Sequence, residues 1–190
     1  MAERKPDRRT AKTEKSIRYA LADLLMEKEL RSITVQELAD KADIHRVTVY
    51  KHYMDVYDIY EQIEQNFLEQ TKELLMKSSE NEKEFYNRLF RYIAENEKAL
   101  KMAFSPHNTE HLRDKLSAMS QDLCRRKWEK CWQGKPVDAK AEMVISYHVN
   151  GSLSILSDWI LGGRKWPEDE VIEILTYLER QTEELLMVLA

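Results

Sequence analysis

Five side chains that can bind nucleic acid lie close together in the first third of the chain. Arginine and lysine bind phosphates and guanine edges, and histidine and threonine hydrogen-bond to phosphates or bases. If this segment is a helix, we expect these groups on its outer face, with Ile44 and Val49 anchoring the inner face. A rigid helix with such an outer face can enter the major groove of DNA. The five residues are His45, Arg46, Thr48, Lys51 and His52.

The residues just before this segment predict a second short helix. The sequence Thr34-Val-Gln-Glu37 matches a capping box, in which the threonine hydroxyl accepts from the glutamate N–H and the glutamate carboxylate reaches back. We therefore predict a helix over Val35–Lys41, a turn at Asp43-Ile44 and a second helix over about 45–52. Two short helices joined by a tight turn are typical of a helix-turn-helix motif.

Apolar residues recur at helical spacing on both sides of this motif. One long helix is predicted from about Thr10 to near Leu30, and another begins near Asp55, whose side chain can cap it. The remaining predicted helices are one that begins around Phe85, short ones between Ser105-Pro106 and Trp132, and two long ones over about 139–161 and 167–189.

Glycine and proline are rare in this chain. Each occurs four times in 190 residues, and after Pro6 neither type appears again until Pro106. Strand turns and Gly-rich phosphate loops depend on these residues, so a sandwich, a barrel or a nucleotide-binding α/β domain is excluded. We predict an all-α fold. The regions we expect are a disordered basic tail over 1–9, a helix-turn-helix domain over 10–56 and a helical regulatory and dimerisation domain over 57–190.

Charge is distributed unevenly along the chain. The net charge is −4 overall, but residues 1–55 carry +2 and the remaining residues carry −6. Arg4–Arg18 is either a basic arm that reaches DNA or a solvated tail. No stretch approaches the length of a membrane span, no secretory signal is present, and two cysteines fit a reducing compartment. We expect a cytoplasmic protein with no membrane partner.

The helix-turn-helix segment resembles the DNA-binding signature of the TetR family of transcriptional regulators, which is roughly T-x-x-x-I-A-x-x-A-G-V-S-x-x-T-x-Y-x-H-F. The resemblance implies a homodimeric regulator, most often a repressor, that binds a palindromic operator in double-stranded DNA until an effector releases it. The matching residues are Thr34, Leu38, Ala39, Ala42, Ile44, Thr48, Tyr50, His52 and Tyr53.

The resemblance also assigns roles and exposes three departures. Asp43 replaces a usual glycine, and aspartate tolerates the left-handed conformation better than most residues. Val47 occupies a position often held by glycine and restricts the approach to DNA, and Val56 replaces a common lysine that contacts phosphate. The residues expected at the DNA backbone are Thr34, Thr48, Tyr50, Lys51 and His52, and those expected nearest the bases are His45 and Arg46.

The last two predicted helices carry the expected dimer interface. The helix over about 139–161 is apolar on two sides, so it needs its own core on one side and a second subunit on the other. Gly151 and the run Asp158–Gly163 also resemble a Gram-positive subgroup of regulators related to those of dihydroxyacetone kinase. The expected interface residues are Leu153, Leu156, Ile160, Ile174, Leu178 and Leu185.

A pocket for an unknown effector is expected among the middle helices. Aromatic residues are its candidate wall, although most of them are also explained as ordinary core. The effector is either a small molecule or a protein. These candidates are Tyr86, Phe90, Phe104, Trp128, Trp132 and Tyr147.

Metal and catalytic chemistry find little support. His107 and His111 have a spacing that can bind one metal, and Cys124 and Cys131 lie seven apart, but surface histidines and buried thiols explain both pairs. No nucleophile elbow, phosphate loop or carboxylate pair is present. We expect no metal, no cofactor and no enzyme activity. The second interpretation is a helical co-regulator or activator that acts through a protein partner and has weak DNA affinity of its own.

Overall fold

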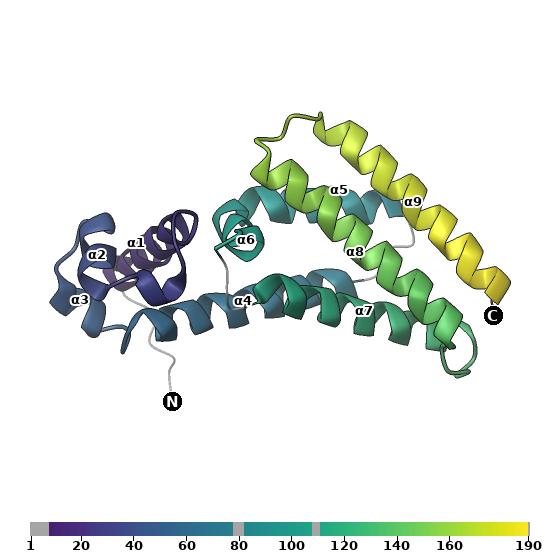
Figure 1. The fold of residues 1–190 in the computed structure, drawn as a ribbon, viewed down its shortest axis with the longest axis horizontal. Coiled ribbons are helices and arrows are strands. Elements are labelled where there is room, and N and C mark those ends of the chain that lie inside the picture. The colour runs from purple at the N-terminus through teal and green to yellow at the C-terminus, as the bar shows by residue number, and fades with distance from the viewer. Residues whose placement is uncertain (1–7, 78–81, 108–110, 190) are drawn as a thin grey trace.

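The computed structural model of the chain describes residues 8–77, 82–107 and 111–189. All regular structure in these ranges is helical, as the scarcity of glycine and proline predicts (Figure 1). None of the helices in these ranges is long and apolar enough to cross a membrane. The elements are α1 (Arg8–Leu25), the 3-10 helix η1 (Leu30–Ser32), α2 (Val35–Lys41), α3 (Arg46–Tyr50), α4 (Val56–Met76), α5 (Glu82–Glu95), α6 (Glu97–Phe104), α7 (Leu112–Cys131), α8 (Ala139–Leu161) and α9 (Glu168–Leu189).

Helices α1, α2 and α3 pack together at one end of the molecule (Figure 1). The apolar stripe of α1, including Ile17 and Leu21, is buried against Leu38 and Ala39 of α2. The α1 helix ends at Leu25, earlier than predicted. Leu30 is buried in the same core, but it belongs to a 3-10 turn. Its spacing from the apolar residues of α1 is the same as in a longer helix, so the sequence pattern does not separate the two cases.

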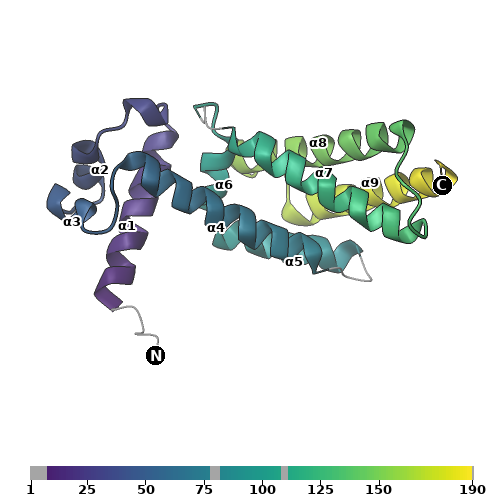
Figure 2. The ribbon, with the colours of Figure 1, turned by 90° about the horizontal axis from the view of Figure 1, so that it is seen from below.

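The long helix α4 connects this end to the rest of the molecule (Figures 1 and 2). Asp55 caps it, as predicted, by accepting from the N–H groups of Tyr57 and Asp58 at 2.8 and 2.9 Å. Its first turns pack on α1 and its later turns on α7. Val56 is buried at its first position, so this departure from the family pattern contributes to the core.

The C-terminal helices form a second packed body. Helix α5 packs on α9, α7 on α8, and α8 on α9, while α6 lies between α1 and α8. Phe90 and Trp159 pack together at its centre, with ring centroids 4.9 Å apart and ring planes tilted by 59°. The bounds of α8 agree with prediction. Helix α7 is one continuous helix rather than several short ones, because no glycine or proline interrupts its polar sequence.

Part of the expected N-terminal tail is ordered helix. Residues 1–7 lie outside the described residues, but Arg8 and Arg9 belong to α1. The basic segment that was expected to be an arm or a solvated tail therefore continues as helix from Arg8 to Arg18. Much later in the chain, Gly134 follows the end of α7 with a φ of +84°, a conformation that glycine adopts without strain.

Candidate nucleic-acid interface

The turn between α2 and α3 is built by local hydrogen bonds. The Glu37 N–H donates to Thr34 Oγ1 at 3.2 Å and starts α2 at Val35, as the capping signal predicts. At the other end, the Ile44 N–H donates to the Ala39 carbonyl at 3.0 Å. Asp43 makes the turn with a φ of +54°, so aspartate occupies the left-handed position where the family usually has glycine. The turn thus forms without its glycine.

The carboxylate of Glu37 does not close the capping box. It pairs instead with Lys28 Nζ, which lies 2.5 and 2.6 Å from its two oxygens. The hydrogen bond from Lys28 lowers the pKa of the Glu37 carboxyl. The predicted hydrogen bond from the Thr34 N–H to the Glu37 carboxylate is therefore replaced by an ion pair between α2 and the segment that follows α1.

Helix α3 is anchored on its inner face and capped by a histidine. Val49 is fully buried against α2, and Ile44 packs beside it. His45 precedes the helix, and its Nδ1 accepts from the Val47 N–H at 3.3 Å. The helix spans five residues rather than the predicted eight because His45 serves as the cap and Lys51 ends it. His45 is thus engaged with the backbone of its own helix.

The outer face of α3 is exposed to solvent. The side chains of Arg46, Val47, Tyr50 and Lys51 are exposed, and Thr48 is half-buried. Tyr50 has 57 % of its surface exposed. Among the described residues, neither Arg46 nor Lys51 is paired with a carboxylate. Two free cations and a phenol on one face can bind phosphates and base edges.

His52 lies differently from the prediction. Its side chain is half-buried, and its Nδ1 lies 3.4 Å from Glu14 Oε1 of α1. Glu14 also pairs with Arg18 at 3.3 Å. Because His52 faces α1, it is not on the open face of α3. Tyr53 is buried, and burial raises the pKa of its hydroxyl.

Comparisons with known proteins decide the family. The TetR_C_8 family model, described as the C-terminal region of transcriptional regulators, matches residues 80–181, which is more than half of the chain. The chain belongs to the TetR family. No curated protein sequence matches it closely enough to extend this assignment.

Solved structures of regulatory proteins share the fold, one of them described as a TetR-family transcriptional regulator. A regulator from Streptomyces coelicolor has a TM-score of 0.63 at 17 % identity, over 93 % of this chain and 83 % of that one. The fatty acid degradation regulator FadR from Bacillus halodurans has a TM-score of 0.57 at 14 % identity, over 93 % and 96 %. The dihydroxyacetone kinase operon activator DhaS has a TM-score of 0.52 at 19 % identity, over 93 % and 94 %.

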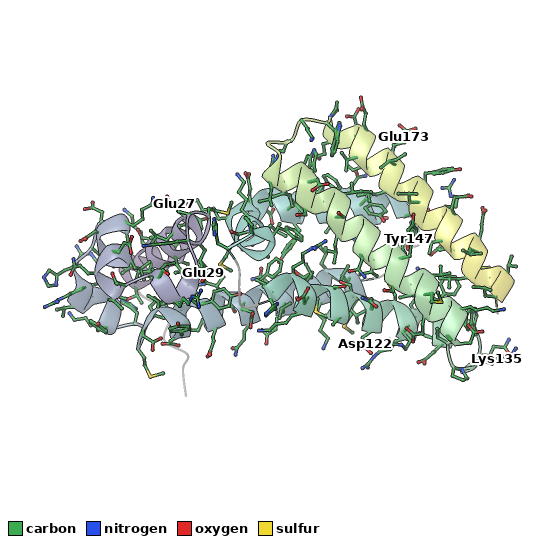
Figure 3. The ribbon with its side chains drawn as sticks, in the orientation of Figure 1. Glu27, Glu29, Asp122, Lys135, Tyr147 and Glu173 are labelled. Carbon is green, nitrogen blue, oxygen red and sulfur yellow. The ribbon has the colours of Figure 1, made fainter. Side chains whose placement is uncertain are left out.

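In this TetR-family chain the aromatic residues expected around an effector lie mostly in the core. Tyr86, Phe90, Phe104 and Trp128 are buried, and Trp132 is half-buried. Tyr147 is 79 % exposed on the surface of α8, so it does not line an interior pocket (Figure 3). The prediction failed there because both stripes of α8 are apolar, and the sequence does not tell which faces inward.

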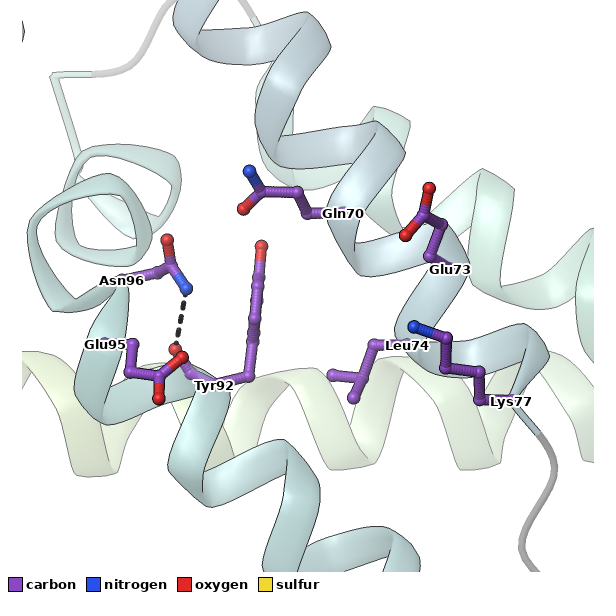
Figure 4. Close-up of a pocket in the computed structure, with 7 residues that line it drawn as sticks. All are labelled: Gln70, Glu73, Leu74, Lys77, Tyr92, Glu95 and Asn96. Carbon is purple, nitrogen blue, oxygen red and sulfur yellow. Dashed lines mark hydrogen bonds between the residues drawn. The ribbon is translucent and has the colours of Figure 1, made fainter. Parts of the chain in front are cut away.

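Two surface hollows are lined by other residues. One, of about 220 Å³, lies between α4 and α5, with Tyr92 between Gln70 and Asn96 (Figure 4). The Tyr92 hydroxyl lies 3.1 Å from Thr71 Oγ1 on α4, and the Asn96 amide donates to the Tyr92 carbonyl at 3.0 Å. The other hollow, of about 530 Å³, lies between α7 and α8 beside Ser117 and Asn150. None of the six aromatic candidates lines either hollow.

The expected dimer residues divide between core and surface. Ile174 and Leu185 of α9 are about half exposed, and Leu178 is half-buried. On α8, by contrast, three expected residues are buried within the chain's own core: Leu153, Leu156 and Ile160. The open stripe of α8 instead carries Met143 and Tyr147, which are 73 % and 79 % exposed.

The metal candidates are not brought together. His111 is exposed and lies 3.1 Å from Asp114, and His107 is half-buried. Within the described ranges no three such ligands gather as a metal site would need. Cys124 is half-buried, and burial raises the pKa of its thiol to about 11, while Cys131 is exposed rather than buried.

A polar cluster inside the C-terminal body was not found from the sequence. His148 Nε2 of α8 lies 2.7 Å from Glu179 Oε2 of α9, and the Tyr86 hydroxyl of α5 donates to the same oxygen at 3.3 Å. Lys127 of α7 lies 2.7 Å from Glu183 and 3.9 Å from Glu179. Four helices thus meet at one half-buried carboxylate. Tyr86, His148 and Glu179 lie far apart in the sequence, so their spacing does not predict that their side chains meet.

Proposed function

We propose that this chain is a homodimeric repressor that binds a palindromic operator through α3 and leaves it when an effector binds residues 57–190. The observation that carries the proposal is the outer face of α3, where Arg46, Tyr50 and Lys51 are exposed and unpaired while Val49 anchors the opposite face. A short helix held rigidly on one face and cationic on the other is suited to the major groove.

Dimerisation is supported by the apolar surface that α8 and α9 leave open. Met143 and Tyr147 are exposed on α8, and Ile174, Tyr177 and Leu185 are exposed on α9. Because α8 and α9 pack side by side, two copies related by a two-fold axis can bury these stripes in a four-helix interface. The same axis sets two α3 helices one turn of DNA apart, about 34–36 Å.

Helix α6 supports a route from effector to operator. Lys98 Nζ lies 2.9 and 3.0 Å from the carboxylate of Asp23 on α1, and Ser105 Oγ donates to the Leu25 carbonyl at 2.8 Å. At its other side, Glu97 lies 2.8 Å from Arg164, just beyond α8. An effector that moves α6 therefore moves α1. The two α3 helices then no longer match successive major grooves.

The test is DNA binding by the full chain at physiological salt, using fragments of the promoter region adjacent to the gene. We expect salt-sensitive, sequence-specific binding that Tyr50→Ala abolishes. Lys51→Ala is expected to weaken binding and to reduce the slope of log affinity against log salt by about two, one for each protomer.

Lys72→Ala is the matched control for this test, because Lys72 is an exposed lysine on α4, well outside the helix-turn-helix. It should leave both affinity and salt slope unchanged. If no genomic fragment is bound with sequence preference, or if Lys51→Ala behaves like Lys72→Ala, the repressor proposal is wrong.

A second candidate is an activator or co-regulator that works through a protein partner. The fold likeness to DhaS, whose name describes an operon activator, favours it, and both hollows lie at the surface, where a protein can reach them. On this candidate the chain raises transcription from the adjacent promoter and binds DNA selectively only with its partner present. Repression by the purified chain alone would contradict it.

A further inference from the structure

The outer face of α3 has an apolar side chain at its centre. Val47 is 52 % exposed, while Val49, two residues later, is fully buried. At about 100° per residue the two side chains point roughly 200° apart, so Val47 is directed away from the core that holds α3. Arg46, Tyr50 and Lys51 surround it on the same face.

The direction of Val47 is fixed by its surroundings. Val49 and Ile44 anchor α3, and a valine on a helix has essentially one rotamer, so its two methyl groups are presented in a single orientation. His45 uses its Nδ1 to cap the helix at the Val47 N–H, which leaves only its Nε2 to reach DNA. In the first turn of α3 itself, Arg46 and Val47 are the exposed side chains. Figure 1 shows α3 at the end of the molecule away from α9.

In the major groove, the apolar group on the base edges is the C5-methyl of thymine. Cytosine, adenine and guanine present amino, carbonyl or ring-nitrogen groups there. A valine packed against one of these polar groups displaces the water bound to it and offers no hydrogen bond in its place, which is unfavourable. A valine against a thymine methyl buries two apolar groups at once.

We propose that Val47 selects thymine at one position of each operator half-site by contact with its C5-methyl. This inference rests on the proposed DNA-binding function and names the base chemistry that α3 reads. Val47 would therefore set specificity at a position where a glycine, which has no side chain, could not.

The experiment begins with sites selected by the full chain from a pool of random duplex DNA. Each thymine of the selected site is then replaced in turn by deoxyuridine, which lacks only the methyl group. For the unmodified chain we expect one thymine per half-site at which this replacement weakens binding about fourfold, and about 16-fold when both half-sites are replaced. With Val47→Ala, thymine and uracil sites should bind equally.

Two further variants separate the contact from general damage. Lys51→Ala should weaken binding to thymine and uracil sites by the same factor and keep the difference between them. Val47→Thr keeps the shape of the side chain but replaces a methyl with a hydroxyl, and should reduce the difference. Because Val47 is exposed, both Val47 variants should melt within a few degrees of the unmodified chain.

The outcomes distinguish this inference from the proposed function. Sequence-selective binding with equal affinity for thymine and uracil sites overturns the inference and leaves the function standing. So does a selected site without a recurrent thymine, or a methyl effect that survives in Val47→Ala. If the full chain selects no sequence at all, the function and the inference both fail.

Discussion

Glu179 is a half-buried carboxylate whose environment favours its charged form. Burial alone would raise its pKa, but the hydrogen bond from His148, the charges of His148 and Lys127, and the hydrogen bond from Tyr86 lower it on balance. The contributing groups come from three other helices: Tyr86 of α5, Lys127 of α7 and His148 of α8. A single charged side chain therefore helps to hold four helices together.

The stability of the chain should depend on pH through this residue. Because the folded-state pKa of Glu179 is depressed, its contribution is full above the unfolded value of about 4.5 and is lost as the pH falls through the folded value. We expect Glu179→Gln to lower the free energy of unfolding by about 2 kcal/mol at pH 7 and to flatten its decline below pH 4.5. Urea denaturation across pH measures both.

Glu173→Gln is the control for this prediction. Glu173 lies on the same helix but is exposed, and within the described residues it makes no ion pair (Figure 3). Its substitution should change the free energy of unfolding by less than about 0.5 kcal/mol at any pH. Equal effects of the two substitutions would show that the cluster around Glu179 contributes nothing special.

Helix α6, like α4, connects the two packed bodies. Lys98 of α6 lies over the Tyr19 ring of α1, 4.7 Å from its centroid. Two hydrogen-bonded contacts also join α6 to α1, and they differ in their surroundings. The Lys98–Asp23 pair is about two-fifths exposed, so water screens it. Ser105 is buried, and its hydroxyl both donates to the Leu25 carbonyl and accepts from the His107 N–H at 3.2 Å.

The two contacts should therefore differ in energy. Ser105→Ala leaves a carbonyl and an N–H without their partner, and we expect it to lower the free energy of unfolding by about 1–3 kcal/mol. Lys98→Ala should lower it by less than about 1 kcal/mol, because it removes an exposed ion pair. Denaturant titration of both variants tests the order. If Lys98→Ala lowered the free energy of unfolding more than Ser105→Ala, the ion pair would be the stronger connection between α6 and α1.

At the scale of the whole molecule, the open apolar face of α8 and α9 is the surface through which we propose that two copies associate. Tyr147 and Ile174 lie on that face, whereas Leu153 is in the chain's own core. In a two-fold dimer each interface residue occurs twice, once in each copy. A single substitution on this face therefore places two charges in the interface.

We expect Tyr147→Glu to weaken dimerisation about 100-fold or more while the helical content stays unchanged. Met76→Glu, on an exposed residue of α4, should leave the dimer intact. Leu153→Ala should instead lower stability by about 2–5 kcal/mol, because it opens a cavity in a packed core. Sedimentation velocity and thermal melting measure the two effects. A Tyr147→Glu chain that still sediments as a dimer would place the interface elsewhere.

Features that depend on near neighbours in the chain could be predicted from the sequence. Thr34 and Asp55 cap their helices, α2 and α8 have the predicted bounds, and Asp43 makes the left-handed turn. Capping, helical period and turn conformation act over a few residues, so the side chains that decide them are adjacent in the sequence. The TetR signature lies in this same local region.

Only the tertiary structure decided which side each helix turns inward. Both stripes of α8 are apolar, and the fold buries Leu153 while leaving Tyr147 outside. His52 turns from the DNA-facing side toward Glu14, nearly forty residues earlier, and His148 meets Glu179 and Tyr86 from other helices. Burial and ion pairing depend on groups brought together through space. The sequence by itself therefore determined the helices and the helix-turn-helix, and the packing of those helices decided which residues remain free to act.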